Sequence, residues 1–405
     1  MTRITAAESS AASYSVSCRE NTPSEAQSIA ARMVAAACLP NGYKKGVSLA
    51  GKRGGDRAMT AVEEASVPLR EAWYYALPGR RLKHRGVVAK MMLGEPILIG
   101  RDAVGTVFAL RDLCPHRGMP LSAGAFDGSE VECCYHGWRF DTSGRCTVIP
   151  SLVPGQSFTP DRIHVRSYPV CEVQGNIWVF FGDNPEAAPD IPLLEGFQGR
   201  VSDLVESVVF TTSIDHAVVG LMDPAHGPFV HRAWWWRSRR SIHAKAKEFV
   251  PSPFGFTMSR HRPSHNSRAY RLLGGVPETE IVFRLPSVRV EHIRAGRHRV
   301  CNLTAITAID DRLTEINHCI YWTSPWLKVL KPFLRRYVRA FLHQDRDIME
   351  RQQQGLRFSP PLTLIDDADT QAKWYYRLKR EYRRARAEGR PFKNPVEPRT
   401  LEWRS

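Results

Sequence analysis

The chain has 405 residues, a length that suits two domains with sizeable cores. Its formal net charge is +16, and much of the excess lies in the run from Arg377 to Arg390. No nucleic-acid motif accompanies this charge, so we expect no nucleic-acid binding, and the run indicates either a solvated terminal helix or a docking surface for an acidic protein. The nine cysteines have no disulfide-framework spacing and no apolar run approaches a membrane span, which predicts a cytoplasmic protein.

Residues 1–65 are rich in Ala, Ser and Gly and carry little apolar periodicity, apart from a short helix expected over Ser24–Ala37. Met59 opens the segment MTAVEEASVPLREAWYYALPG, which is typical of a natural protein start. We therefore predict that residues 1–65 are a disordered extension, or that the first 58 residues are the product of a start codon placed too early. A targeting peptide is the alternative, and its acidic residues count against it.

Short strands broken by Gly and Asp turns are predicted over residues 66–185. Ala103–Gly105 and Asp141–Gly144 are each flanked by strand-like segments and predict two hairpins, and Asn176–Phe181 predicts a buried strand. These patterns predict a small antiparallel β-sandwich with loops at its hairpin tips.

Two of these loops each offer one cysteine and one histidine, Cys114-Pro-His116 and Cys133-Cys-Tyr-His136. Two thiolates and two neutral imidazoles can hold a [2Fe–2S] cluster, with Cys on one iron and His on the other, at a raised reduction potential. Zinc also accepts a Cys2His2 set. Zinc fingers usually pair like residues in sequence, however, whereas each pair here is mixed.

The Pro-rich segment Asn184–Pro192 predicts a domain boundary, followed by a second domain over residues 186–405. No GxGxxG motif is present, so no nicotinamide or flavin site is predicted. The patterns predict an α+β domain in which an antiparallel sheet is flanked by helices. Its predicted strands are 207–214, 280–284, 288–294, 300–309 and 314–322, and its predicted helices lie near 330–354 and 367–387.

A second histidine pair follows in the segment IDHAVVGLMDPAHGPFVHRAWWW. Asp223 and His226 are three residues apart, which predicts that they share a helical face, and Gly227-Pro228 should break that helix and bring His231 inward. Two histidines with one carboxylate form the facial triad of non-haem Fe(II) oxygenases. The simpler alternative is a pair of core or surface histidines.

A further carboxylate is available in the segment FLHQDRDIMERQQQ. Asp345 falls at helical spacing on one apolar face with Val338 and Leu342. A carboxylate on such a face is unfavourable unless it meets a cation. We therefore predict Asp345 as the third ligand, with Asp347 as the alternative.

The segments CPHRG and CCYHGWRF resemble the C-x-H…C-x2-H motif of Rieske proteins. Together with D-x2-H-x4-H downstream, they make the chain from Trp73 to its last helix resemble the Rieske non-haem iron oxygenases. The C-x2-H spacing of that family selects Cys133 over Cys134. The resemblance implies a [2Fe–2S] cluster on Cys114, His116, Cys133 and His136, and a mononuclear Fe(II) on His226, His231 and Asp345.

In that family the residue matching Asp223 is a bridge, which implies contacts with His226 and with the partner subunit's His136 in a head-to-tail homotrimer. A helix N-cap before Pro224 is the alternative role of Asp223. The chain departs from the family at Gly220, where many relatives have Asn. The residues Trp234–Trp236 predict either an apolar pocket wall or core packing.

The resemblance implies the oxygenase component of a system built from one subunit type, in enzyme class EC 1.14. An external ferredoxin or ferredoxin reductase would supply electrons, so that NAD(P)H acts only indirectly. The reaction expected is O2-dependent hydroxylation or oxidative demethylation of a small organic substrate, aromatic or otherwise apolar. The alternatives are an electron-transfer Rieske protein with a non-catalytic second domain, and a zinc-bearing binding module.

Overall fold

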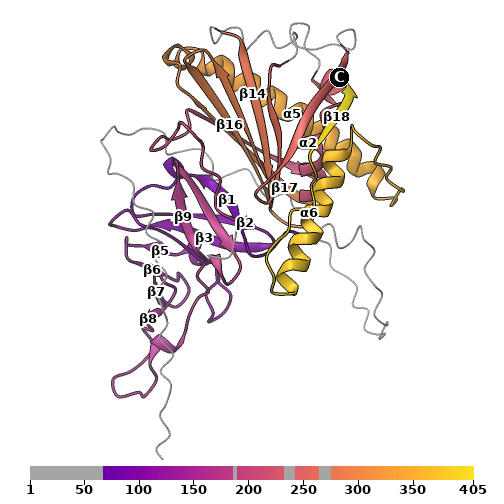
Figure 1. Cartoon of the computed structure of the whole chain (residues 1–405). Helices are drawn as coiled ribbons and strands as arrows, with labels where there is room; N and C mark the ends of the chain where they lie inside the picture. The colour runs from indigo at the N-terminus through magenta and orange to yellow at the C-terminus, as the bar shows by residue number, and fades with distance from the viewer. Residues whose placement is uncertain (1–66, 186–188, 232–241, 264–274) are drawn as a thin grey trace, which may run out of the picture.

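The computed structural model describes residues 67–185, 189–231, 242–263 and 275–405. The predictions for residues 1–65 and for Trp234–Trp236 lie outside these ranges. Figure 1 shows two regions of the chain: strands β1–β10 occupy one region, and strands β11–β18 with helices α2, α5 and α6 occupy the other.

The first region contains three antiparallel sheets, with strand orders β1-β10-β9, β2-β3-β4 and β5-β6-β7-β8. Strand β10 is buried along its whole length, as its apolar run from Ile177 to Phe181 predicts. The bounds are β1 Ala72–Pro78, β2 Gly86–Met92, β3 Glu95–Arg101, β4 Val107–Arg111, β5 Ala125–Phe126, β6 Glu130–Glu132, β7 Arg139–Asp141, β8 Cys146–Val148, β9 Val170–Val173 and β10 Asn176–Phe181.

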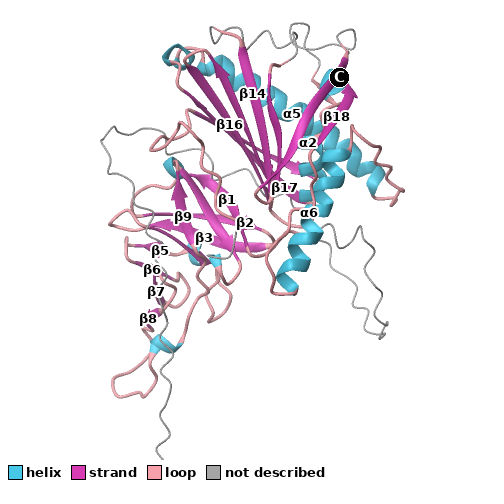
Figure 2. Ribbon diagram, in the orientation of Figure 1, coloured by secondary structure: helices cyan, strands magenta, loops and turns pink. Residues whose placement is uncertain are grey.

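The second region is an eight-stranded antiparallel sheet, ordered β11-β17-β16-β15-β14-β13-β12-β18, with helices packed beside it (Figure 2). The strand bounds are β11 Leu204–Thr211, β12 Ala244–Ser252, β13 Gly255–His261, β14 Pro277–Arg284, β15 Val288–Ala295, β16 His298–Ala308, β17 Leu313–Trp322 and β18 Arg399–Arg404. The main helices are α2 Ile214–Met222, α3 Gly227–Val230, α5 Lys331–Leu356 and α6 Thr370–Ala387.

The predicted α+β class, with a small antiparallel β region and a larger sheet flanked by helices, is confirmed. Strands β12, β13 and β18 were not predicted from the sequence. Strand β12 has the sequence AKAKEFVPS, in which alanine alternates with lysine over the first four residues and Phe249-Val250 are the only large apolar side chains, so its strand pattern is weak. The prediction of strand through Ile214 was wrong, because α2 begins at that residue.

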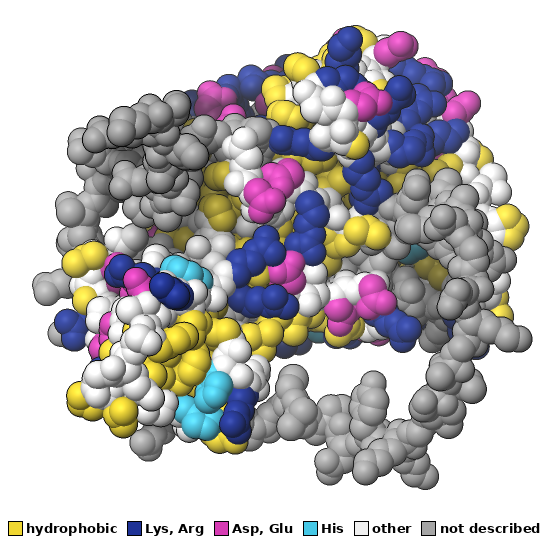
Figure 3. Space-filling model, turned by 90° about the horizontal axis from the view of Figure 1, so that it is seen from below, with side chains coloured by type: hydrophobic (Ala, Val, Ile, Leu, Met, Phe, Trp, Pro, Cys, Tyr) yellow, Lys and Arg dark blue, Asp and Glu magenta, His cyan; other side chains and the backbone are white. Residues whose placement is uncertain are grey.

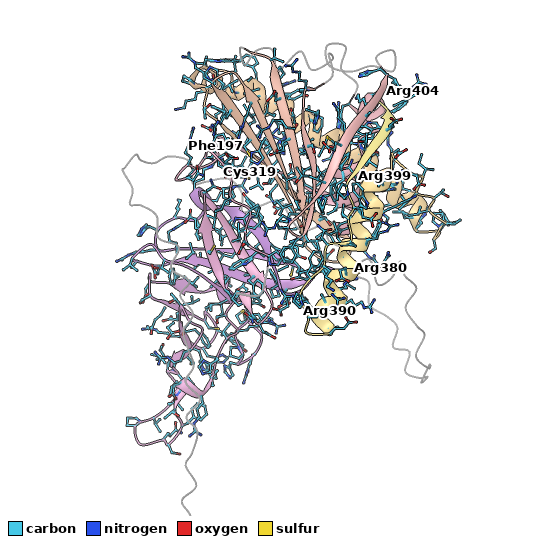
Figure 4. The ribbon with its side chains drawn as sticks, in the orientation of Figure 1. Phe197, Cys319, Arg380, Arg390, Arg399 and Arg404 are labelled. Carbon is cyan, nitrogen blue, oxygen red and sulfur yellow. The ribbon has the colours of Figure 1, made fainter. Side chains whose placement is uncertain are left out.

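The sequence predicted an exposed terminal helix over the basic run, but α6 is exposed on one face only. It buries Trp374, Tyr375, Leu378 and Tyr382 on one face. Several arginines of the basic run are paired: Arg390 binds Glu381 and Arg384 binds Glu388. Figure 4 shows Arg390 near the lower end of α6, away from β18.

Direct bonds tie the two regions together. The backbone N–H of Leu93, beyond β2, donates to the carbonyl of Ala308 in β16 at 2.8 Å. The Asn176 side chain of β10 donates to the Tyr321 hydroxyl of β17 at 2.6 Å. These buried bonds fix the β1–β10 region against the large sheet. Among the described residues no helix has the length and apolar character needed to span a membrane.

Candidate metal centres

Two loops of the first region have the same backbone hydrogen-bond pattern. The Cys114 N–H donates to Met119 O and the Gly118 N–H to Cys114 O, at 2.7 and 2.8 Å. Residues Cys133, Trp138 and Gly137 repeat these bonds at the same sequence offsets, at 2.8 and 3.0 Å. Both glycines have positive φ, 71° and 68°, which favours glycine at each turn. The loops are therefore two copies of one turn that presents a buried thiol.

The loops bring like side chains together, although each loop mixes one Cys with one His. The Cys114 and Cys133 thiols are buried and interact, and burial together with Cys133 raises the pKa of the Cys114 thiol to about 11. The imidazole rings of His116 and His136 lie 4.5 Å apart, centre to centre. The buried Nδ1 of His136 has no hydrogen-bond partner. Paired thiols facing paired imidazoles fit a cluster with Cys on one iron and His on the other.

The exposure of the two neighbouring cysteines and the separation of the four side chains both agree with this ligand set. Cys134 is exposed whereas Cys133 is buried beside Cys114, which agrees with the choice made from the spacing. The four side chains contain no group of three whose ligand atoms all lie within 4.8 Å of one another. That separation suits ligands divided between two iron atoms and does not suit one tetrahedral zinc.

The histidine pair of the second region lies where α2 ends. The prediction that Asp223 and His226 share a helical face was wrong: α2 ends at Met222, and Asp223 has extended backbone angles because Pro224 follows. The Asp223 carboxylate accepts the Ala225 N–H at 2.7 Å. The pair Gly227-Pro228 then begins the short helix α3 and does not break one. His226 and His231 therefore flank α3.

Three side chains converge here within 4.8 Å, the one such group among the described residues: His226, His231 and Asp345. The two Nε2 atoms lie 3.2 Å apart, and Asp345 Oδ1 lies 3.2 Å from His231 Nε2 and 3.7 Å from His226 Nε2. Ligand atoms about 3 Å apart are expected around one metal ion at bond lengths of about 2.1 Å and angles near 90°. The three residues therefore fit a facial metal site with one open side.

Helix α5 decides which aspartate faces the histidines. The Asp345 side chain is 25% exposed and points to the pair, whereas Asp347 is 54% exposed and binds Arg346. These two residues lie two positions apart on a helix, so they project from different faces. The alternative ligand Asp347 is not brought to the site.

Each histidine has a polar side chain beside its second ring nitrogen. His226 Nδ1 lies 3.5 Å from Asp223 Oδ2. Burial raises the pKa of the Asp223 carboxyl, but His226 and nearby backbone N–H groups outweigh this, and the pKa is lowered. His231 Nδ1 lies 3.0 Å from Gln344 Oε1, and its ring stacks on Phe341. Gln344 was not singled out from the sequence; its one signal is that it directly precedes Asp345.

Gly220, the departure noted in the sequence, lies on α2 against α5. A Cβ added at this position would lie 2.7 Å from the terminal methyl of Met349. A side chain at this position would displace Met349, so close packing of α2 against α5, the helix that carries Asp345, takes the place of the missing asparagine. His216 and Asp215 lie nearby on α2 but outside the three-ligand group.

Comparison with known proteins identifies the first region of the chain. A model of the Rieske [2Fe-2S] domain matches residues 72–169. The chain is 45% identical over 129 residues to 4beta-methylsterol monooxygenase of Methylococcus capsulatus, covering 31% of this chain and 35% of that protein. It is 35% identical over 173 residues to the oxygenase component of dicamba O-demethylase of Stenotrophomonas maltophilia, covering 41% and 48%. The chain thus spans a third to a half of these relatives.

The fold agrees over a longer stretch. A crystal structure of dicamba monooxygenase bound to dicamba superposes with a TM-score of 0.64 at 22% identity, covering 79% of this chain and 98% of that one. The chain therefore contains a Rieske [2Fe-2S] domain over residues 72–169, as the sequence predicted. Its fold agrees with that of an oxygenase over most of the chain.

Proposed function

We propose that this Rieske protein is the terminal component of an oxygenase system, and that it hydroxylates or oxidatively demethylates a small, largely apolar organic substrate with O2. The observation that carries the proposal is the convergence of His226, His231 and Asp345 at one point in a chain that also has a Rieske domain. A mononuclear Fe(II) on these three residues would supply O2 activation. We assign the cluster to Cys114, His116, Cys133 and His136.

The protein's own residues prepare this site. Asp223 and Gln344 each hold the Nδ1 side of one histidine, which leaves both Nε2 atoms free for a metal. His231 is buried and stacked on Phe341, so its ring has one stable orientation. The ligand oxygen of Asp345 approaches from α5 and completes three neighbouring positions, which leaves the opposite side open for O2 and substrate.

We propose Asp223 as the bridge to the cluster of a neighbouring subunit. The second cluster loop joins β6 to β7 in the β5–β8 sheet. This sheet lies far from α2 and α5 in Figure 1. Electrons would therefore pass from the partner subunit's His136 through Asp223 to His226, in a head-to-tail homotrimer. The side chain of Asp223 is 34% exposed, so it remains accessible to a neighbour.

We propose an acidic ferredoxin or a ferredoxin reductase as the electron donor, so that NAD(P)H acts only through the partner. Lys and Arg side chains are spread over the face seen in Figure 3, which favours an acidic protein. We place the protein in the cytoplasm, since its described cysteines are free thiols. We also propose domains over 66–185 and 186–405, after an extension over 1–65.

Metal analysis of protein produced without oxygen and with added iron tests the function. We expect three irons and two acid-labile sulfides per chain, and substrate-dependent O2 uptake with a surrogate reductase. Two irons per chain under these conditions would support the electron carrier instead. Zinc in a colourless protein would support the binding module.

Changing Gln344 to leucine should weaken metal binding at the three-residue site about 10- to 100-fold, because His231 loses the group that orients its ring. Titration of the iron-depleted site with Co(II), followed by its visible absorption, measures this. Gln344→Glu should restore most of the affinity because a carboxylate also accepts the Nδ1 proton. Equal affinity for the leucine variant and the parent protein would contradict the role.

Changing Asp223 to asparagine should slow turnover about 10- to 100-fold while all three irons remain, because the bridge between the two centres is altered and no ligand is removed. Rapid-mixing measurement of cluster reoxidation by O2 and substrate checks the step. An unchanged rate of cluster reoxidation, with the iron content intact, would show that Asp223 has only a local structural role.

A further inference from the structure

The cavity beside the three-ligand site carries information about the substrate class. We propose that the substrate is an uncharged molecule with an extended apolar body of several fused rings or similar bulk, and that His318 and its neighbours hold a single hydroxyl or carbonyl group on it. This inference rests on the proposed function, since it describes the substrate of that same site.

The size of the cavity indicates the bulk of the ligand. Its volume is about 1500 Å³, and it is bounded by α2 and α5 on one side and by the large sheet on the other. Pockets for drug-sized ligands usually measure about 300–1,000 Å³. A single substituted ring would leave most of this space filled with water, so it would be held in no fixed position relative to the three ligands.

Most of the wall is apolar. Because side chains alternate along a strand, alternate residues in part of each of β15, β16 and β17 line the cavity. Several of these residues are aliphatic, and α5 adds aromatic and aliphatic side chains opposite them. The apolar lining includes Ile281, Ile293, Val300, Ile316, Ile320 and Phe341. Such a wall favours an apolar body through the removal of both surfaces from water.

A polar patch interrupts this wall at one place on the sheet. Thr304 pairs with Arg289 and His318 across the strands, and Glu291 pairs with Asn302. All five residues line the cavity. The metal ligands His226, His231 and Asp345 line the same cavity as this patch. A polar group bound here would place the apolar body along the cavity.

The patch carries no net charge. The Arg289 guanidinium lies 3.4 Å from a Glu291 carboxylate oxygen, and Asn302 Nδ2 lies 3.4 Å from the same oxygen. Burial lowers the pKa of His318 to about 4, so its imidazole is neutral near pH 7. At this patch an ionic ligand group would lose its hydration and meet no unpaired charge of opposite sign. A hydroxyl or carbonyl group loses less hydration, and a single hydrogen bond compensates for that loss. The patch therefore favours an uncharged polar group.

His318 is the residue best placed to bind that group. Its Nδ1 is held by the Thr304 hydroxyl at 2.8 Å, and Thr304 itself is buried. In the described part of the chain its Nε2 has no hydrogen-bond partner. One ring nitrogen is thus fixed by the sheet and the other is available to a ligand in the cavity.

Equilibrium dialysis of the anaerobic, iron-loaded protein tests the proposal with four probes. These are 5α-androstan-3β-ol, its parent hydrocarbon 5α-androstane, its 3-sulfate ester and benzyl alcohol. We expect the steroid alcohol to bind with one molecule per chain, and each of the other three to bind at least about tenfold more weakly, because each lacks the hydroxyl, the neutrality or the bulk.

Two histidine variants locate the polar contact. His318→Phe should weaken binding of the alcohol about tenfold and leave the hydrocarbon unchanged. His292→Phe is the matched control: it changes a histidine of the same sheet that does not line the cavity, and it should change neither affinity. His318→Gln, which keeps a hydrogen-bonding group, should retain the preference for the alcohol.

Several results would overturn the proposal: no binding of any probe, equal or tighter binding of the sulfate ester or of benzyl alcohol, or equal losses for alcohol and hydrocarbon in His318→Phe. The iron content of the same samples separates this failure from that of the proposed function. Three irons per chain with any of these results would reject the substrate class alone, whereas two irons would reject the oxygenase.

Discussion

Changing Asp345 to alanine should remove one of the three irons expected per chain and abolish O2-dependent turnover, while the visible spectrum of the cluster persists. Among the described residues Asp345 supplies the carboxylate oxygen beside the two Nε2 atoms, 3.2 Å from His231 and 3.7 Å from His226. Without it two neutral imidazoles remain, and they bind a divalent ion far more weakly than the complete triad. Elemental analysis, absorption spectra and O2 uptake measure the three effects.

Asp347→Ala is the matched control, since it removes the same group from the same helix two residues away. Its carboxylate binds Arg346 on the surface, so this variant should keep three irons and its activity. An Asp345→Ala protein that retains the third iron, or an Asp347→Ala protein that loses it, would show that the site has been assigned to the wrong carboxylate.

Changing Lys379 to methionine should lower the free energy of unfolding by about 3–5 kcal/mol, because it leaves the charge of Asp215 buried without a cation. The two side chains are 2% and 4% exposed and form an ion pair between α6 and α2. The Tyr375 hydroxyl donates to the same Asp215 oxygen. This cluster fixes the last helix against α2, the helix that leads into the histidine pair. Urea unfolding followed by tryptophan fluorescence measures the change.

Two companion variants separate charge burial from lost packing. Asp215→Asn/Lys379→Met removes both charges and keeps a partner for Tyr375, so it should recover most of the loss. Lys373→Met breaks an ion pair with Asp366, which is 75% exposed, and should change stability by less than about 1 kcal/mol. A double variant as unstable as Lys379→Met would contradict the explanation by charge.

The residue types and spacings of the ligands could be predicted from the sequence because metal chemistry restricts them strongly. Few side chains bind iron, and short mixed Cys/His pairs at loop positions are rare without a cluster. Helical spacing selected Asp345 over Asp347 because a carboxylate on an apolar face needs a cation. The α+β class followed from strand and helix periodicities that long elements display clearly.

Other features could not be predicted, because they depend on contacts between distant segments. The sequence pairs Cys with His, whereas the folded loops pair Cys114 with Cys133 and His116 with His136. The lysines of β12 are typical of exposed loops, so the strand was not predicted. The role of Gln344 could not be predicted because it depends on the packing of α5 beside His231. The polar patch of His318 and Thr304 exists only because β16 and β17 adopt one register.

The sequence by itself determined which side chains are available to bind iron, since coordination chemistry depends on residue type and on short spacings. The tertiary structure alone decided which of these side chains meet, which nitrogen of each histidine faces the site and how large the adjoining cavity is. Those properties come from packing between α2, α5 and the sheet, where a shift of one residue in register would turn each side chain to the opposite face.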